Sequence, residues 1–364
     1  MGRQVYLKPV GLLPALPAAS ETSSGSLPLA GGWLDFTALE VVRRHGSSDG
    51  RAVLVIPEFC EREWGVETLS AAGLFEALRQ PRPRLAGLSL DRPRIMGIVN
   101  LTPDSFSDGA QFATAQAAVD HALRLDDEGA DIIDLGAEST RPGSDAVSLE
   151  EELSRLLPVI EGLAGKTRAR LSVDTRKAEV MRRAAAAGID LINDVSALTH
   201  DPAALPVVAA CGLPVVLMHA RGDPKTMQLD PRYDNVLLDV FDFLEERIRA
   251  CEAGGIPLAR IIVDPGIGFG KTLDHNLELL TGLTLFHGLG APLLLGSSRK
   301  RFIGALTGVE HASKRVAGSV AAALHAVSQG AQIVRVHDVA ATREALTVWQ
   351  AASAGRVARA PSGC

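Results

Sequence analysis

Short apolar segments alternate with longer amphipathic ones from about residue 94 to the end of the chain. Eight short segments are present, each too short for a helix and apolar at both odd and even positions. This pattern is typical of strands that are buried on both faces of a sheet. The eight segments are Arg94–Asn100, Ala130–Glu138, Arg170–Thr175, Asp190–Val195, Leu213–His219, Arg260–Gly266, Pro292–Ser298 and Ala331–Asp338.

The longer segments between them have helical spacing. Four of them end in a glycine, where a left-handed residue commonly stops a helix: Ala113–Gly129, Lys177–Gly188, Asn235–Gly254 and Lys314–Gly330. Parallel strands need such crossover helices. Eight strand–helix units predict a (β/α)8 TIM barrel. A doubly wound sheet is the alternative, but the glycine-rich phosphate turn usual after its first strand is missing here.

The first 88 residues have a different pattern. Arg51–Phe59 predicts one strand and Leu69–Leu78 a helix, while Gly31–Arg44 gives mixed signals. A segment rich in Pro and Arg, Arg79–Arg94, indicates a linker. We therefore predict a small N-terminal α+β extension over residues 1–88, of unknown role, and a barrel domain over residues 89–364.

Composition narrows the class of protein. The chain has 364 residues, 46% of them hydrophobic, with a net charge of −6 and a pI near 5.9. This charge argues against a dedicated binder of nucleic acid or of membrane surfaces. The four cysteines are scattered, no signal peptide is recognisable, and no apolar run approaches the ~18 residues of a membrane span. These features predict a cytoplasmic protein without disulfides or a zinc site.

Each predicted strand ends in polar or ionisable groups. The carboxyl ends of TIM-barrel strands form one rim, where function resides, so these groups should converge. The alternative for Asp, Asn and Ser is that they cap strand ends or the N-termini of the following helices, but this does not account for Lys300, Arg335 and His337. The full set is Asn100, Glu138, Asp174, Asn193 with Asp194, His219, Asp264, Ser298 with Lys300, and Arg335 with His337.

The kinds of side chain suggest two subsites. Asp174, Asn193 and Asp264 offer acceptors and an amide suited to a flat heterocycle with several N–H donors, such as an aminopyrimidinone; a metal site is the weaker alternative. Arg335 and His337 lie two residues apart on the last strand, which neighbours the first strand in a closed barrel. With Asn100 they would suit a phosphate or diphosphate and its Mg²⁺.

Eight ordered segments give the chain a family resemblance. They are IMGIVNLTPDSFSDG, GAESTRPGS, SVDTRKAEV, LINDVSAL, LMHARGDPKTMQ, IIVDPGIGFGKT, SSRKRFIG and VRVHDV, and together they span about Arg94 to Gln350. This sequence resembles the bacterial dihydropteroate synthases. Members of that family join 6-hydroxymethyl-7,8-dihydropterin diphosphate to 4-aminobenzoate in folate synthesis, release diphosphate, and are the target of sulfonamides.

The resemblance implies roles for individual residues. Asp174, Asn193, Asp264 and Lys300 would bind the pterin, and Asn100, Arg335 and His337 the diphosphate and Mg²⁺, with Asn100 as the metal ligand. Phe106, Thr140, Arg141, Pro142 and Phe269 would shape the aminobenzoate site, and Met218 would be a further substrate-binding residue. Lys300, Arg335, His337, Phe106 and Arg141 would act in catalysis. Arg301 stands where many members have Ser.

The resemblance also sets expectations about movement and assembly. The loops after the first two strands, TPDSFSDGAQF and STRPGSD, contain Pro, Gly and small polar residues and are expected to act as lids. We expect a homodimer with small-molecule substrates only. Two alternatives remain: a pterin-binding methyltransferase domain, which should lack the STRPG loop and the SRK segment, and a pterin-binding protein without catalysis.

Overall fold

A closed barrel of eight parallel strands forms the body of the protein. The computed structural model describes residues 4–15, 25–45, 48–62, 68–101, 111–139, 146–222 and 226–354. The sheet order is β10-β9-β8-β7-β6-β5-β12-β11, and a parallel bridge between Val263 and Leu293 joins its two ends. The predicted TIM barrel is therefore confirmed, with all eight strands where the sequence placed them. They are β5 (Arg94–Asn100), β6 (Ile132–Gly136), β7 (Arg170–Asp174), β8 (Leu191–Asp194), β9 (Val215–Met218), β10 (Ile261–Asp264), β11 (Leu294–Leu295) and β12 (Ile333–Val336).

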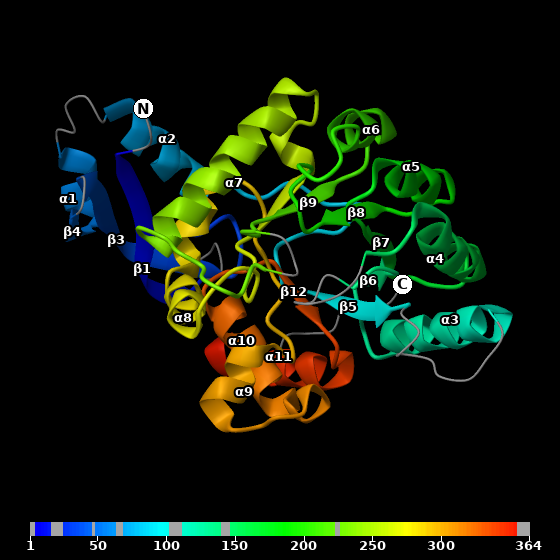
Figure 1. Cartoon of the computed structure of the whole chain (residues 1–364). Coiled ribbons are helices and arrows are strands. Elements are labelled where there is room, and N and C mark those ends of the chain that lie inside the picture. Colours follow the sequence, from blue (N-terminus) through cyan, green and yellow to red (C-terminus); the bar gives the residue numbers. More distant parts are fainter. Residues whose placement is uncertain are drawn as a thin grey trace.

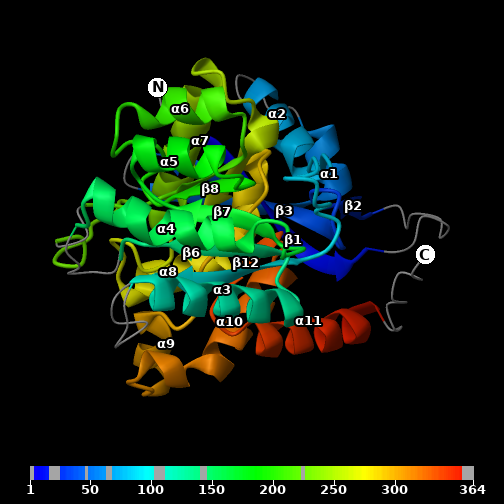
Figure 2. The ribbon, with the colours of Figure 1, turned by 90° about the vertical axis from the view of Figure 1, so that its right-hand side faces the viewer.

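Helices surround the barrel on the outside (Figures 1 and 2). They are α3 (Gln111–Asp127), α4 (Leu149–Leu163), α5 (Ala178–Ala186), α6 (Ala204–Cys211), α7 (Val236–Ala253), α8 (Leu273–Thr281), α9 (Arg301–Thr307), α10 (Val316–Ser328) and α11 (Val339–Ala354). The described residues also contain short 3₁₀ segments at Leu258–Arg260, Leu283–Leu289 and Ala312–Lys314. Of the helices in the described ranges, none combines the length and the apolar character that a bilayer crossing demands.

The N-terminal segment forms a separate antiparallel sheet with two helices. β3 (Leu34–His45) is its central strand, paired with β1 (Val5–Pro14) on one side and with β2 (Leu27–Pro28) and β4 (Ser48–Val55) on the other. The helices are α1 (Ile56–Glu61) and α2 (Thr68–Arg79). The α+β character is thus as predicted, but the strand expected over Arg51–Phe59 ends at Val55. Pro57 lies in the first turn of α1, where proline favours a helix start.

This sheet packs on the outside of the barrel rather than standing apart from it. The Tyr6 hydroxyl donates to the Asp242 carboxylate of α7 at 2.8 Å, and its ring meets Phe241 edge-on. The Trp33 indole donates to the Val327 carbonyl of α10 at 3.1 Å. Buried side chains of the sheet and of the barrel form one continuous hydrophobic cluster. The left side of Figure 1 shows the sheet next to α7 and α8.

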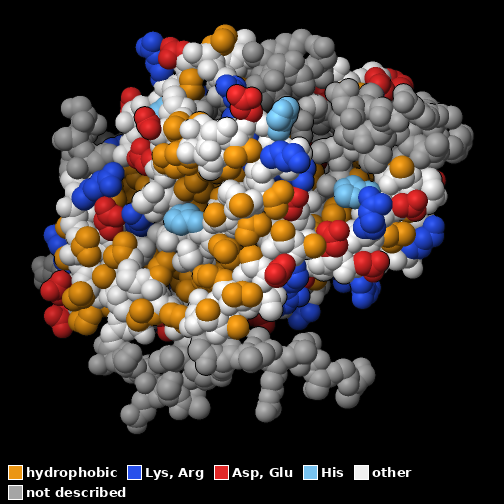
Figure 3. Space-filling view, turned by 90° about the horizontal axis from the view of Figure 1, so that it is seen from below, with side chains coloured by type: hydrophobic (Ala, Val, Ile, Leu, Met, Phe, Trp, Pro, Cys, Tyr) orange, Lys and Arg blue, Asp and Glu red, His pale blue; other side chains and the backbone are white. Residues whose placement is uncertain are grey.

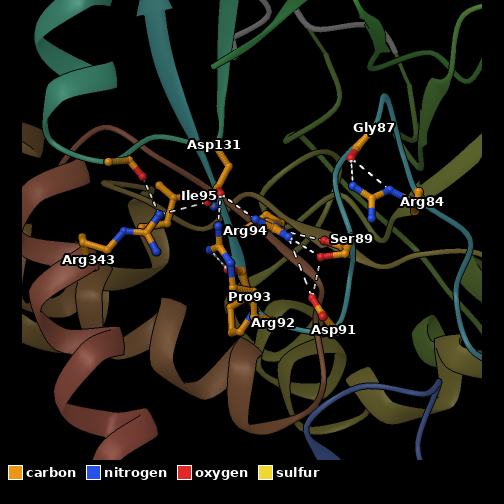
Figure 4. Close-up of polar contacts among 11 residues, drawn as sticks. Arg84, Gly87, Ser89, Asp91, Arg92, Pro93, Arg94, Ile95, Asp131 and Arg343 are labelled. Carbon is orange, nitrogen blue, oxygen red and sulfur yellow. Dashed lines mark hydrogen bonds and ion pairs between the residues drawn. The ribbon is translucent and has the colours of Figure 1, made fainter. Parts of the chain in front are cut away.

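The segment between α2 and β5, predicted as a linker, also closes the bottom of the barrel. Leu85 and Leu90 are buried in a cluster with Met96, Ile132 and other inward-facing residues near the amino ends of the strands. Polar contacts fix this plug, as Figure 4 shows. Arg94 donates to the Ser89 carbonyl at 2.7 Å and to Asp131 at 2.9 Å, and Arg343 of α11 reaches the same carboxylate. The site therefore has to lie at the opposite, carboxyl end.

Candidate functional site

A buried network of four polar side chains forms the floor of the barrel mouth. Arg335 of β12 donates through Nε to Asp134 at 2.7 Å and through Nη2 to Asp174 at 2.9 Å. The Asn193 amide donates to the same Asp134 oxygen at 3.0 Å. The four residues come from β12, β6, β7 and β8, so strands distant in sequence contribute to one constellation, as the topology of the barrel requires.

Asp134 is the member of this network that sequence reasoning missed. It lies inside the apolar run of β6 rather than at its end, and it is fully buried. One of its oxygens, Oδ1, has no hydrogen-bond partner among the described residues. A carboxylate in the middle of an apolar strand that is covered on both faces is a sequence signal for a buried polar network, because such a charge needs a partner.

Burial and neighbouring opposite charges shift the pKa values of the floor residues in opposite directions. Burial, together with the neighbouring Asp134 carboxylate, raises the pKa of Asp174 to about 7, although the Arg335 guanidinium works in the other direction. Burial alone would lower the pKa of Arg335, but Asp134 and Asp174 outweigh it and raise that pKa. Perturbed groups of this kind, clustered at one end of the barrel, are typical of functional sites.

Asp264 and Lys300 form the second half of the floor. Burial raises the pKa of the Asp264 carboxylate, one oxygen of which accepts the Gly266 amide at 2.7 Å. Burial lowers the pKa of Lys300 to about 8 despite the attraction of Asp264 and Asp174. The Lys300 ammonium donates to the Ile267 carbonyl and lies 4.7 Å from the centroid of the Phe269 ring. The floor thus carries several acceptors and two basic groups, the Arg335 guanidinium and the Lys300 side chain, close to each other.

The remaining described candidates line the same mouth. Met218 is buried at the end of β9, in register with Asp264. His337 follows β12, and its Nδ1 lies 3.0 Å from the Ser298 hydroxyl. Asn100 ends β5, which pairs with β12 as predicted. The Arg335 side chain contacts Asp134 and Asp174 in the floor. Its strand, β12, is the neighbour of β5, which ends at Asn100.

Four expected residues lie outside the described residues: Phe106, Thr140, Arg141 and Pro142. Arg301 is described and begins α9, with its side chain exposed.

Three polar strand ends stabilise loops instead of pointing to the floor. Asp194 accepts the Ser196 and Leu198 amides at 2.7 and 2.9 Å, so the interpretation as a strand-end cap is right there; Ala203, not Asp194, is the N-cap of the following helix α6. Glu138 pairs with Arg176 and Lys177, both at 3.1 Å. The His219 ring contacts Lys271.

The donor set bears on the metal alternative. Within the ranges that the structure describes, no three His, Cys, Asp or Glu side chains are grouped so that they could hold a metal ion. Asp174 already has a guanidinium partner. This guanidinium partner makes Asp174 a poor metal ligand, and the acceptors of Asp174, Asn193 and Asp264 suit a polar organic ligand better.

Known proteins resemble the barrel and little of the N-terminal sheet. The family model described as "Pterin binding enzyme" matches residues 96–337. Dihydropteroate synthase of Escherichia coli K12 is 50% identical over 264 residues, which cover 72% of this chain and 93% of that protein.

Solved structures agree with this match. A dihydropteroate synthase of Xanthomonas albilineans with 4-aminobenzoic acid has 57% identity and a TM-score of 0.71, covering 75% of this chain and 99% of that one. The same enzyme in complex with 7,8-dihydropteroate has 54% identity and a TM-score of 0.68, with the same coverage. With its strand order, its buried floor and these matches, the chain belongs to the pterin-binding enzyme family, among the dihydropteroate synthases.

Proposed function

We propose that this chain joins 6-hydroxymethyl-7,8-dihydropterin diphosphate to 4-aminobenzoate, and that its own floor residues bind the pterin. The observation that carries the assignment is the set of buried acceptors, Asp174, Asn193 and Asp264, beside the Lys300 ammonium. A pterin presents several N–H donors and ring acceptors in one plane, which such a set can satisfy. Asp134 and Arg335 would hold Asp174 and Asn193 in place for it.

The leaving group would be bound at the rim above β5 and β12. Asn100 is half-buried there and offers an amide oxygen, which is the hard donor type that Mg²⁺ prefers, and diphosphate oxygens would supply further ligands. The residues therefore fit the metal. When bound, Mg²⁺ would neutralise charge on the departing diphosphate. His337 would add a donor to the same anion, and Arg335 would do so through the guanidinium nitrogen that is not used in its bonds to Asp134 and Asp174.

The reaction needs no protein nucleophile. Departure of diphosphate breaks the C–O bond at the pterin methylene and leaves a cation that the electron-rich ring stabilises. The aniline nitrogen of 4-aminobenzoate then attacks that carbon and loses a proton. Phe269, whose ring lies under Lys300, would line the second-substrate pocket with Phe106, Thr140, Arg141 and Pro142, and closing loops would exclude water.

A single assay tests the function. Diphosphate release is followed by a coupled reaction with the pterin diphosphate and Mg²⁺, with and without 4-aminobenzoate. We expect release that depends on 4-aminobenzoate, with product of the mass of 7,8-dihydropteroate. The methyltransferase alternative predicts no release, and pterin binding without turnover would favour the non-catalytic one.

We also propose a homodimer that works in the cytoplasm, with residues 1–88 as an extension of the catalytic barrel domain 89–364. Figure 3 shows the face made by α9, α10 and α11, on which hydrophobic side chains gather. Exposed apolar residues on these helices include Ala305, Leu306, Ala317, Ala321 and Val348. Apolar patches of this kind mark interfaces. Light scattering of the parent protein and of Leu306→Glu checks the proposal; a monomeric parent would contradict it.

A further inference from the structure

A buried lysine outside the floor holds the loop between β10 and α8. Lys271 is only 3% exposed, yet among the described residues no carboxylate lies at hydrogen-bonding distance from it. Its Nζ instead lies 2.8 Å from the Gly266 carbonyl, 3.0 Å from the Phe269 carbonyl, and 2.9 Å from Nδ1 of His219. A lysine nitrogen in such a place is costly unless its donors are used. Here each donor has an acceptor.

The backbone of this loop is shaped around that contact. Gly266 has φ +70°, and a Cβ there would come 1.9 Å from the His219 carbonyl oxygen. Gly270 has φ +62°, and its Cβ would come 2.3 Å from the Arg221 carbonyl oxygen. Only glycine tolerates both the conformation and the approach. The loop therefore lies directly on the chain that follows β9, with Lys271 between them.

His219 is suited to accept from Lys271. Burial, with the adjacent Lys271 cation, lowers the pKa of His219 well below its usual value, so the ring is neutral. Burial also lowers the pKa of Lys271 well below its usual value, although the Asp264 carboxylate opposes that shift. In its ammonium form Lys271 can only donate, and Nδ1 of the neutral ring is then the acceptor. The Phe243 ring packs edge-on against the imidazole, with ring centroids 4.9 Å apart. The histidine at the end of β9 is thus fixed as a partner for Lys271 and is not placed for acid–base chemistry.

What the loop presents to the mouth depends on this arrangement. The Ile267 carbonyl accepts from Lys300, and the Phe269 ring lies 4.7 Å from the same ammonium. Lys271 binds the carbonyls of Gly266 and Phe269. Ile267 lies between these two residues in the sequence, and Phe269 is one of them. We propose that Lys271, with His219 as its acceptor, is a positioning residue that sets the Ile267 carbonyl and the Phe269 ring for the second substrate. This rests on the proposed function only for the identity of that substrate.

The test compares Lys271→Met, which keeps length and removes all donors, with two variants of its partner. His219→Asn keeps an acceptor near the position of Nδ1, and His219→Leu removes it. Lys166→Met, at an exposed site after α4, is the matched control. Two readouts are used: hydrogen exchange of a peptide covering residues 265–271, and separate kcat, KM for 4-aminobenzoate and affinity for 6-hydroxymethylpterin.

We expect Lys271→Met and His219→Leu to speed exchange in this peptide at least tenfold and to raise KM for 4-aminobenzoate about tenfold or more, the effect of losing one or more charge-assisted bonds. Pterin affinity should fall less, because Asp174 and Asn193 are untouched. His219→Asn should restore values within about threefold of the parent, and Lys166→Met should match the parent.

Parent-like exchange and KM in Lys271→Met would overturn the inference. A lower kcat with an unchanged KM would also overturn it, because that result indicates only a smaller fraction of folded enzyme. If Lys271→Met does not fold, His219→Leu and His219→Asn provide the test. Equal hydrogen exchange and equal KM in these two variants would contradict the inference. An inactive parent would reject the proposed function, while hydrogen exchange would still test the role of Lys271 in the loop.

Discussion

Arg335 is the cation that two buried carboxylates share, so its removal should be costly. In Arg335→Met the side chain keeps its bulk, but Asp134 and Asp174 lose bonds of 2.7 and 2.9 Å. Breaking a buried ion pair by removing one partner typically costs about 3–5 kcal/mol. With a urea dependence of about 3 kcal/mol per molar, the unfolding midpoint should fall by about 1–1.7 M at pH 8.

The cost should depend on pH in a defined direction. Burial raises the pKa of Asp174 to about 7 in the folded protein, above its unfolded value, so ionisation of Asp174 disfavours folding as pH rises through that range. Arg335 opposes the shift, and its removal raises the pKa further. The variant should therefore differ least from the parent near pH 5.5, where Asp174 is protonated, and most near pH 8.

Urea unfolding followed by circular dichroism at pH 5.5, 7 and 8 measures both effects. Arg168→Met is the matched control, because its side chain is 79% exposed and its ion pairs are 3.6 and 3.7 Å long; it should cost below about 1 kcal/mol. Adding Asp174→Asn to Arg335→Met should recover part of the loss. A loss at pH 8 under 1 kcal/mol, or one that does not change with pH, would refute the reasoning.

The other predictions concern the floor, the lid and the barrel bottom. Asp174→Asn and Asp264→Asn should each weaken pterin binding about ten- to a hundredfold, because an amide presents a donor where the carboxylate accepts; calorimetry showing parent affinity would remove them from the floor. Phe106→Ala should lose affinity for 4-aminobenzoate and sulfonamides but not for pterin. In the parent protein, 4-aminobenzoate and sulfonamides should bind only when diphosphate, Mg²⁺ and a pterin are present, with a coupling free energy of about 1–3 kcal/mol. Sulfonamide binding to the free protein with equal affinity would contradict this. Leu85→Ala should cost about 2–5 kcal/mol in urea unfolding, since the side chain is 2% exposed in the plug; a parent-like midpoint would show that the plug is dispensable.

The local pattern of hydrophobic and polar residues was sufficient to predict the barrel fold. Strands covered on both faces are apolar throughout, and the crossover helices end at glycines, so the periodicity predicted all eight strands and the fold. Polar groups at strand ends converge by topology alone, which is why Asp174, Asn193 and Asp264 could be chosen from the sequence. The family resemblance then supplied the substrates, and the matches with known proteins confirmed the family.

Tertiary structure decided which of those polar groups face the ligand. Asp194, Glu138 and His219 are equally polar strand ends, but each finds a partner in a neighbouring loop, and that partner is distant in sequence or set by loop geometry. Asp134 was hidden in an apolar run, because its partner Arg335 is 201 residues away. The linker similarly became a plug, since only the closed barrel creates the cavity that Leu85 fills. Sequence periodicity reports burial, whereas pairing between strands is settled only when the chain folds.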